Sequence, residues 1–219
     1  MSDPARAPRN TLSRDLVVAR AVALADRDGL GVLTIRNLAA ECGVKPMAIY
    51  HHIANKEAIL DAIVDAVFAE VYVPRTSRPW RDELAERSRS MRATLRRHPW
   101  ALALMEARRN PGPATLLGHE ACLEVLRSAG FSLQATAHAY AVLDAFVYGF
   151  ALQEAMLDQV GLAESAAELV EGMNLAGFPR MAEFATQHVL AEGYSFASSF
   201  EVGLDLVLDA LERLRVAFP

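Results

Sequence analysis

Apolar residues recur every three to four positions along almost the whole chain, and no segment shows the alternation that is typical of strands. In the first such segment, residues 14–28, Ser13 is positioned to cap a helix and Gly29 to end it. The pattern predicts an amphipathic helix whose buried stripe consists of Leu16, Val17, Ala21, Leu24 and Ala25.

Two short helices are predicted next. Thr34 is the expected N-cap of a helix over residues 35–42, which Gly43 ends. The second helix, 46–52, starts with Pro46, whose missing N–H costs nothing in the first turn. Helices this short are marginal in water, so we expect both to be held by packing through Ile35, Leu38, Ala39, Ile49 and Ile53.

A fourth, longer helix is predicted from Lys56 to about residue 72, with Asn55 as its N-cap. Its apolar residues Ile59, Ile63 and Val67 repeat every four positions. The segment 73–80 contains two prolines, and we interpret it as a domain boundary.

The rest of the chain is also predicted to be helical, and Ser198 and Glu201 have the spacing of a capping box. The expected helices cover residues 82–98, 100–109, 114–129, 132–160, 163–176, 180–191 and 196–217. The predicted fold is therefore all-α. It has a flexible N-terminal tail (1–12), a three-helix domain joined to a long helix (13–72) and a C-terminal helical bundle (80–219).

Composition restricts the class of protein. Hydrophobic residues make up 53% and charged residues 22% of the chain, which favours a folded domain with a sizeable core. The two cysteines are too few for a disulfide framework, which indicates a reducing compartment. The most apolar long segment, 139–152, is shorter than the ~20 residues that span a bilayer. We therefore predict a soluble, cytoplasmic protein without a membrane partner.

The net charge is −5, which by itself disfavours a nucleic-acid partner, but the charges are unevenly distributed along the chain. Residues 1–60 hold 8 Lys and Arg against 6 Asp and Glu, whereas residues 61–219 hold 14 against 21. A slightly basic N-terminal part on an acidic body suits a protein whose N-terminal part alone contacts phosphate, although chance over 60 residues also explains it.

Two short helices joined by a glycine turn are the arrangement of a helix-turn-helix, whose second helix enters the major groove of DNA. With Ile49 and Ile53 buried, the open side of that helix carries Met47, Ala48, His51 and His52. Tyr50 is placed to contact phosphate. Lys45 and Lys56, the only lysines of the chain, bracket this face.

The segments LTIRNLAAECGV (33–44) and IYHHIANKEAIL (49–60) follow the first helix in this order. From Ser13 to Val71 the chain thereby resembles the TetR family of transcriptional regulators. A weaker likeness lies further on, in AGFS (129–132) and FEVGLDLVLDAL (200–211). These segments resemble the C-terminal domain of the tetracycline-repressor branch, in which two helices pair with their copies in a dimer interface.

The resemblance implies a homodimer formed through residues 132–160 and 196–217, with a double-stranded DNA operator and a small-molecule effector as partners. It places Arg36 at a position that contacts DNA and Lys56 at that of a phosphate-contacting lysine. Lys45 departs from the usual Ser or Thr and cannot cap the helix, so we expect it to reach a phosphate. The predicted DNA contacts are Thr34, Arg36, Lys45, Pro46, Met47, Ala48, Tyr50, His51, His52 and Lys56.

Aromatic, methionine and polar side chains of the C-terminal part either pack in its core or together enclose an apolar pocket. The predicted pocket residues are Trp100, Met105, His138, Phe146, Phe150, Gln153 and Met173. Tetracycline repressors hold a drug-bound Mg²⁺ with a His and a Glu. Because Glu106 and Gln153 take these positions here, we predict neither a metal nor a cofactor.

The sequence contains no G-x-S-x-G elbow, no glycine-rich phosphate loop and no Glu-x-x-His pair, so we predict that the protein is not an enzyme. Two functions remain. The first, which we favour, is a ligand-responsive, homodimeric DNA-binding regulator that acts as a repressor and is released from a palindromic operator by its small-molecule effector. The second is a helical small-molecule-binding or protein-interaction module that no longer reads DNA, which the net negative charge and the unusual face of residues 45–48 suggest.

Overall fold

A computed structural model describes residues 12–105, 111–159 and 170–218. Every regular element among them is helical, which confirms the predicted all-α class. The N-terminal part contains α1 (Arg14–Asp28), the 3₁₀ turn η1 (Leu30–Val32), α2 (Ile35–Glu41), α3 (Pro46–Tyr50) and α4 (Lys56–Ala69).

The ends of these helices are set by the residues that the sequence indicates. The side chains of Ser13, Thr34 and Asn55 accept the backbone N–H three residues ahead, at 3.1, 3.1 and 2.8 Å. Gly29 and Gly43 both have positive φ, 80° and 66°, a conformation that favours glycine. Local capping therefore determines where α1, α2 and α4 begin.

The C-terminal part follows a linker. It contains α5 (Trp80–Arg97), η2 (Pro99–Ala101), α6 (Leu102–Met105), α7 (Pro113–Ser128), α8 (Leu133–Gln159), α10 (Pro179–Phe184), the π-helical turn η3 (Ala185–Val189), η4 (Phe196–Ser198) and α11 (Ser199–Ala217). The tail over residues 1–11, the end of the helix expected over 100–109 and the first half of the helix expected over 163–176 lie outside the described residues. The expectation for 163–176 is wrong at its end, because the helix stops at Glu171 and residues 173–175 have no regular structure.

The predicted capping box at the start of α11 is wrong. The hydroxyl of Ser198 donates to the carbonyl of Ser195 at 2.7 Å and makes no bond to the first turn of α11. The Ser-x-x-Glu spacing is present, but the serine instead closes the preceding 3₁₀ turn.

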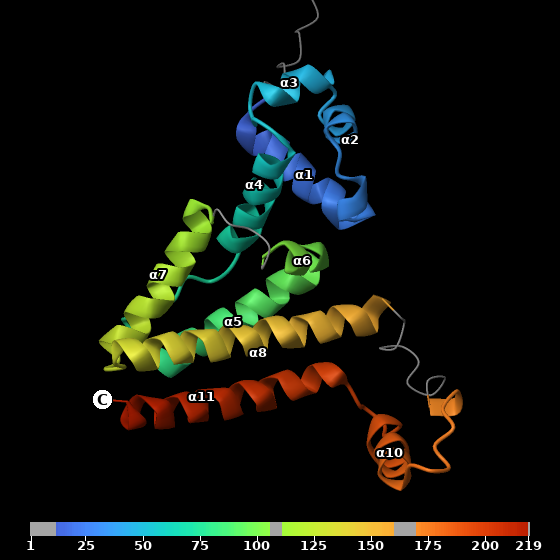
Figure 1. Ribbon diagram of the computed structural model, residues 1–219, viewed down its shortest axis with the longest axis vertical. Coiled ribbons are helices and arrows are strands. Elements are labelled where there is room, and N and C mark those ends of the chain that lie inside the picture. Colours follow the sequence, from blue (N-terminus) through green and yellow to red (C-terminus); the bar gives the residue numbers. More distant parts are fainter. Residues whose placement is uncertain (1–11, 106–110, 160–169, 219) are drawn as a thin grey trace, which may run out of the picture.

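The helices form two connected parts (Figure 1). α3 lies at one end of the molecule, and α4 runs from it toward the body, where it packs on α7. At the opposite end, α8 and α11 lie side by side. They approach closely because α11 presents bare backbone at Gly203, where an added Cβ would lie 2.7 Å from the ring of Phe146.

A hydrophobic core joins the two parts. The buried residues of α1 to α4 are continuous with Leu95 of α5, Trp100 of η2 and Val147 of α8. A polar contact reinforces this junction, because the carboxylate of Asp26 accepts the indole N–H of Trp100 at 2.6 Å and bonds to His98 at 2.7 Å. A second core lies between α5, α7, α8 and α11.

The linker after α4 is held by the buried carboxylate of Glu83 in α5. It accepts the hydroxyl of Tyr72 at 2.8 Å and the backbone N–H of Arg75 at 2.7 Å, and pairs with Arg78 at 3.4 Å. The Arg75 N–H lowers the pKa of this carboxyl; burial opposes the shift, and the Tyr72 hydroxyl adds to it.

Among the described residues, one stretch, Leu133–Asp158 of α8, is long and apolar enough to cross a membrane by length and composition. The apolar part of this helix is therefore longer than the segment 139–152 that the sequence pattern indicates. In the structure this helix packs against α5, α7 and α11, and 39% of its apolar part is buried. We assign it to the helical bundle.

Candidate nucleic-acid interface and effector cavity

The turn between α2 and α3 is closed by backbone hydrogen bonds. The N–H of Gly43 donates to the carbonyl of Ala40 at 3.0 Å, and that of Val44 donates to Ala39 at 2.9 Å. The left-handed conformation of Gly43 makes this sharp reversal possible. α3 is therefore held across α2 as the second helix of a helix-turn-helix.

α3 buries one side and exposes the other. Ile49 is fully buried and Ile53 is 4% exposed, whereas Met47 is 68% and Tyr50 44% exposed. The predicted groove-facing set lies on this open side. Lys45, Pro46, Met47, Tyr50 and His51 are exposed, and Ala48 and His52 are half-buried. α3, which carries most of them, lies at one end of the molecule, away from α8 and α11 (Figure 1).

The cations of this end are available for phosphate. Arg36, Lys45 and Lys56 are exposed and form no ion pair within the described part of the chain. The neighbouring carboxylates are neutralised instead, because Arg27 pairs with Asp28 at 2.9 Å and also with Glu41. The hydroxyl of Thr34 accepts the N–H of Asn37 as a cap and keeps its own hydrogen for a further bond.

A second feature is a cavity of about 290 Å³ beside α4. Its walls come from α4, α6, α7 and α8, together with Pro111. The lining side chains are Asp61, Val64, Phe68, Met105, Pro111, Thr115, His119, Tyr140, Asp144 and Tyr148. We call it the outer cavity. Because α4 also leads to the helix-turn-helix, an occupant would touch the element that positions α3.

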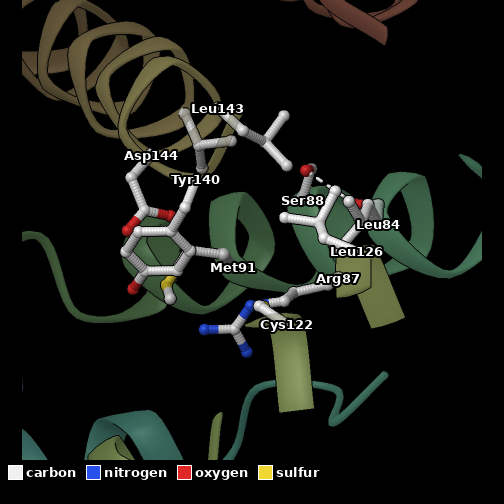
Figure 2. A pocket seen from close by; sticks show the side chains of 10 residues that line it. Leu84, Arg87, Ser88, Met91, Cys122, Leu126, Tyr140, Leu143 and Asp144 are labelled. Atoms are coloured by element: carbon white, nitrogen blue, oxygen red, sulfur yellow. Dashed lines mark hydrogen bonds between the residues drawn. The ribbon is translucent and has the colours of Figure 1, made fainter. Parts of the chain in front are cut away.

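A smaller space, the inner cavity, lies between α5, α7 and α8 and has a volume of about 20 Å³. Figure 2 shows its lining, which includes Arg87, Met91, Cys122, Tyr140 and Asp144. The two cavities share Tyr140 and Asp144 in their walls.

Burial controls the protonation of the cavity walls. Burial, with a smaller contribution from Arg87, lowers the pKa of His119. Burial raises the pKa of Cys122 to about 11, and burial followed by Asp144 raises the pKa of Tyr140. At neutral pH these three groups are therefore uncharged.

The predicted pocket residues are not gathered in one site. Met105 lines the outer cavity, Trp100 packs at the junction with α1, and Phe146 and Phe150 lie in the core with α11. The remaining three, His138, Gln153 and Met173, are exposed. Glu106 lies outside the described residues. In the described ranges, no three His, Cys, Asp or Glu side chains are grouped so that they could hold a metal ion.

The residues that line the cavities and that the sequence analysis missed include Arg87, Thr115, His119 and Tyr140. One signal was present for Arg87. It lies within the apolar stripe of α5, between Leu84 and Met91, where a charged residue is unexpected.

The fold and the exposed face of α3 define a helix-turn-helix DNA-binding regulator with an internal cavity. The chain belongs to the TetR family. Residues 17–63 match the bacterial regulatory proteins of the tetR family, and residues 73–215 match the tetracyclin repressor-like C-terminal domain.

Curated relatives of this chain are also transcriptional regulators. The HTH-type transcriptional repressor DrrR1 of Streptomyces coeruleorubidus is 32% identical, over 96% of this chain and 81% of its own. The class A tetracycline repressor from transposon 1721 of Escherichia coli is 31% identical over 94% of this chain and 93% of its own. These relatives are transcription regulators, not enzymes.

Solved structures share the architecture. The TetR family protein ActR of Streptomyces coelicolor, in complex with actinorhodin, is 26% identical and superposes with a TM-score of 0.76 over 92% of this chain and 96% of its own. The resemblance to the TetR family is confirmed, and the protein is a ligand-responsive, DNA-binding transcriptional repressor of that family.

Proposed function

We propose that the protein binds a palindromic operator as a homodimer and releases it when a small molecule enters the outer cavity. The observation that carries the proposal is that α4 forms a wall of the cavity and also leads directly to the exposed recognition face of α3. We further propose a cytoplasmic location and no catalytic activity.

An apolar surface of α8 and α11 supports the dimer. α11 buries Phe200, Leu204, Leu208 and Leu211 against its own chain, yet a second set of large apolar side chains on the two helices remains exposed. These are Val142, Leu152, Met156, Val202, Leu206 and Val216, which we call the α8–α11 face. Apolar surface of this kind is typical of an interface. A two-fold axis there would present two copies of α3 to half-sites one or more helical turns apart.

Release requires that the effector bind the operator-free conformation more tightly than the operator-bound one. A ligand in the outer cavity contacts Val64 and Phe68 on α4, and a shift of α4 carries α3 with it. A small change in the angle of α4 alters the separation of the two recognition helices, which a pair of fixed half-sites does not tolerate.

A gel-shift titration on the promoter region of the protein's own gene tests the operator. We expect a specific complex that weakens steeply as salt rises, because the released counterions scale with the number of phosphate contacts. The absence of a specific complex at moderate salt would contradict the proposal and favour a small-molecule-binding module that no longer reads DNA.

A further inference from the structure

The guanidinium of Arg87 is buried, and the described residues offer it no counter-charge. Arg87 is 5% exposed, its Nη1 donates to the carbonyl of Tyr72 at 3.3 Å, and its Nη2 has no hydrogen-bond partner. No carboxylate of the described residues lies within 4.0 Å of it. A buried charge without a counter-ion destabilises the folded state, so this arrangement calls for a compensating role.

The same helix contains a half-buried arginine with a counter-ion. Arg92 of α5 forms two hydrogen bonds with Glu154, at 2.7 and 2.5 Å, and its guanidinium lies over the ring of Phe200 at 4.4 Å. α5 thus offers two arginines for comparison: Arg92 has Glu154 as its counter-ion, and Arg87 has none in the part of the chain that the structure describes.

The guanidinium of Arg87 faces a space that is kept open. It lines the inner cavity, where it points toward Tyr140 (Figure 2). On α7 the backbone of Gly118 passes beside it, and an added Cβ would lie 3.2 Å from Nη1 and 3.3 Å from Nη2. The inner cavity has room for one water-sized group, which is also the size of a carboxylate oxygen.

The other charged groups of the two cavities already have partners. Asp61 lines the outer cavity and Asp144 lines both cavities, and each of these carboxylates has an interaction of its own. The remaining polar lining is uncharged at neutral pH, and Phe68, His119 and Tyr148 present ring surfaces. Among the described residues that line the cavities, the charge without a counter-ion is therefore the one at Arg87.

We propose that the effector is a flat, apolar ring compound with a carboxylate, which lies in the outer cavity and extends this carboxylate past Tyr140 to Nη2 of Arg87. The inference rests on the proposed function, because it assigns the ligand class of the same cavity. The carboxylate supplies the missing counter-ion, and the rings contact the aromatic walls.

A pair of probes of equal shape tests the charge requirement. 2-Naphthoate and 2-naphthamide differ in the charge of one small group, and their dissociation constants are measured by calorimetry on the full-length protein. We expect the wild type to bind 2-naphthoate about tenfold or more tightly than 2-naphthamide. In Arg87→Met this preference disappears, while binding of 2-naphthamide is retained.

Two further variants keep the test decisive. Gly118→Ala crowds the guanidinium and should reduce the preference for 2-naphthoate even if Arg87→Met folds poorly. Thermal unfolding without ligand should leave Arg87→Met as stable as the wild type or more so, whereas Arg92→Met is destabilised because it leaves Glu154 unpaired.

Equal affinities of the wild type for the two probes, no binding of either, or an unchanged preference in Arg87→Met would overturn the assignment. Gel shifts without ligand separate this outcome from failure of the proposed function. Arg87→Met should keep the operator affinity of the wild type, and loss of operator binding by the wild type itself would instead contradict the regulator proposal.

Discussion

Asp65 of α4 caps the N-terminus of α7, a different helix: its Oδ1 accepts the backbone N–H of Thr115 at 2.9 Å and the Thr115 hydroxyl at 3.0 Å. The residue at the N-cap position of α7, Gly112, has no side chain to do this. The helix that leads to the DNA-binding part is thereby bonded to a helix that lines the outer cavity.

Removal of this carboxylate should cost stability. We expect Asp65→Ala to lower the free energy of unfolding by about 1–2 kcal/mol, because the first turn of α7 loses its cap. Asp65→Asn keeps an acceptor oxygen and should cost less. Urea unfolding measures both, and equal losses would argue against a capping role.

Gly112 is needed because the Asp65 carboxylate occupies the space beside it. A Cβ at this position would lie 2.2 Å from the Cγ of Asp65, so Gly112→Ala must displace the carboxylate or α7. We expect Gly112→Ala to destabilise the protein by about 1–3 kcal/mol. In the double variant with Asp65→Ala the combined loss should be smaller than the sum, and strict additivity in urea unfolding would show that the two sites are not coupled.

Glu83 should make the linker sensitive to acid. The pKa of the Glu83 carboxyl is lower in the folded protein than in the unfolded chain. The carboxylate therefore stabilises the folded state fully at pH values above the unfolded-state pKa. This stabilisation is lost as the pH falls through the folded-state pKa. Glu83→Gln should be less stable than the wild type at pH 7, and the difference should shrink as the pH falls below about 4.5. Stability measured from pH 7 to 3 checks this, and parallel profiles would exclude the role of Glu83.

The lysines beside α3 should act on affinity without base preference. Lys45→Ala and Lys56→Ala should each weaken operator binding, and each should reduce the slope of log affinity against log salt by about one. Arg96→Ala, which removes an exposed cation of α5, is the control and should change neither value. Gel shifts over a range of salt concentrations measure the slopes. An unchanged slope in both lysine variants would show that they do not contact phosphate.

The α8–α11 face should be required for the dimer. In a two-fold dimer each protomer carries the Leu206→Asp change, so the proposed interface would hold two charges. We expect the dimer dissociation constant to rise about 100-fold or more. Leu117→Asp changes an equally exposed leucine on α7 and should leave the dimer intact. Light scattering during size-exclusion chromatography distinguishes the two species, and a stable dimer of Leu206→Asp would move the interface elsewhere.

Local signals allowed much of this fold to be predicted. Ser13, Thr34 and Asn55 each bond to the turn that follows them, so at these three positions the residue type correctly predicted where a helix starts. Ser198 has the same type and a suitable glutamate, but a competing bond to Ser195 wins, and this is not visible in the spacing.

The cavity was harder to predict because α8 is apolar on several sides. Its 27 residues carry buried Ala139 and Val147 as well as exposed Val142 and Met156, so helical periodicity does not say which side faces a cavity, a core or a partner. Phe146 and Phe150 were chosen as pocket residues for their type, whereas tertiary packing turned them toward α11. Arg87 could not be predicted as a cavity residue from its type, because an arginine on a helix is mostly exposed.

The core shared by the two parts also limits how this protein can be recombined. Leu95, Trp100 and Val147 of the C-terminal part complete the hydrophobic core of the N-terminal helices. A chimaera that joins this N-terminal part to the C-terminal part of another regulator at the linker 73–79 would therefore lack matching side chains in this shared core. We expect operator preference to be exchangeable through the exposed side chains of α2 and α3, which contribute little to that core. For a designer who wishes to redirect this regulator to another promoter, the transferable unit is a handful of surface side chains, not a domain.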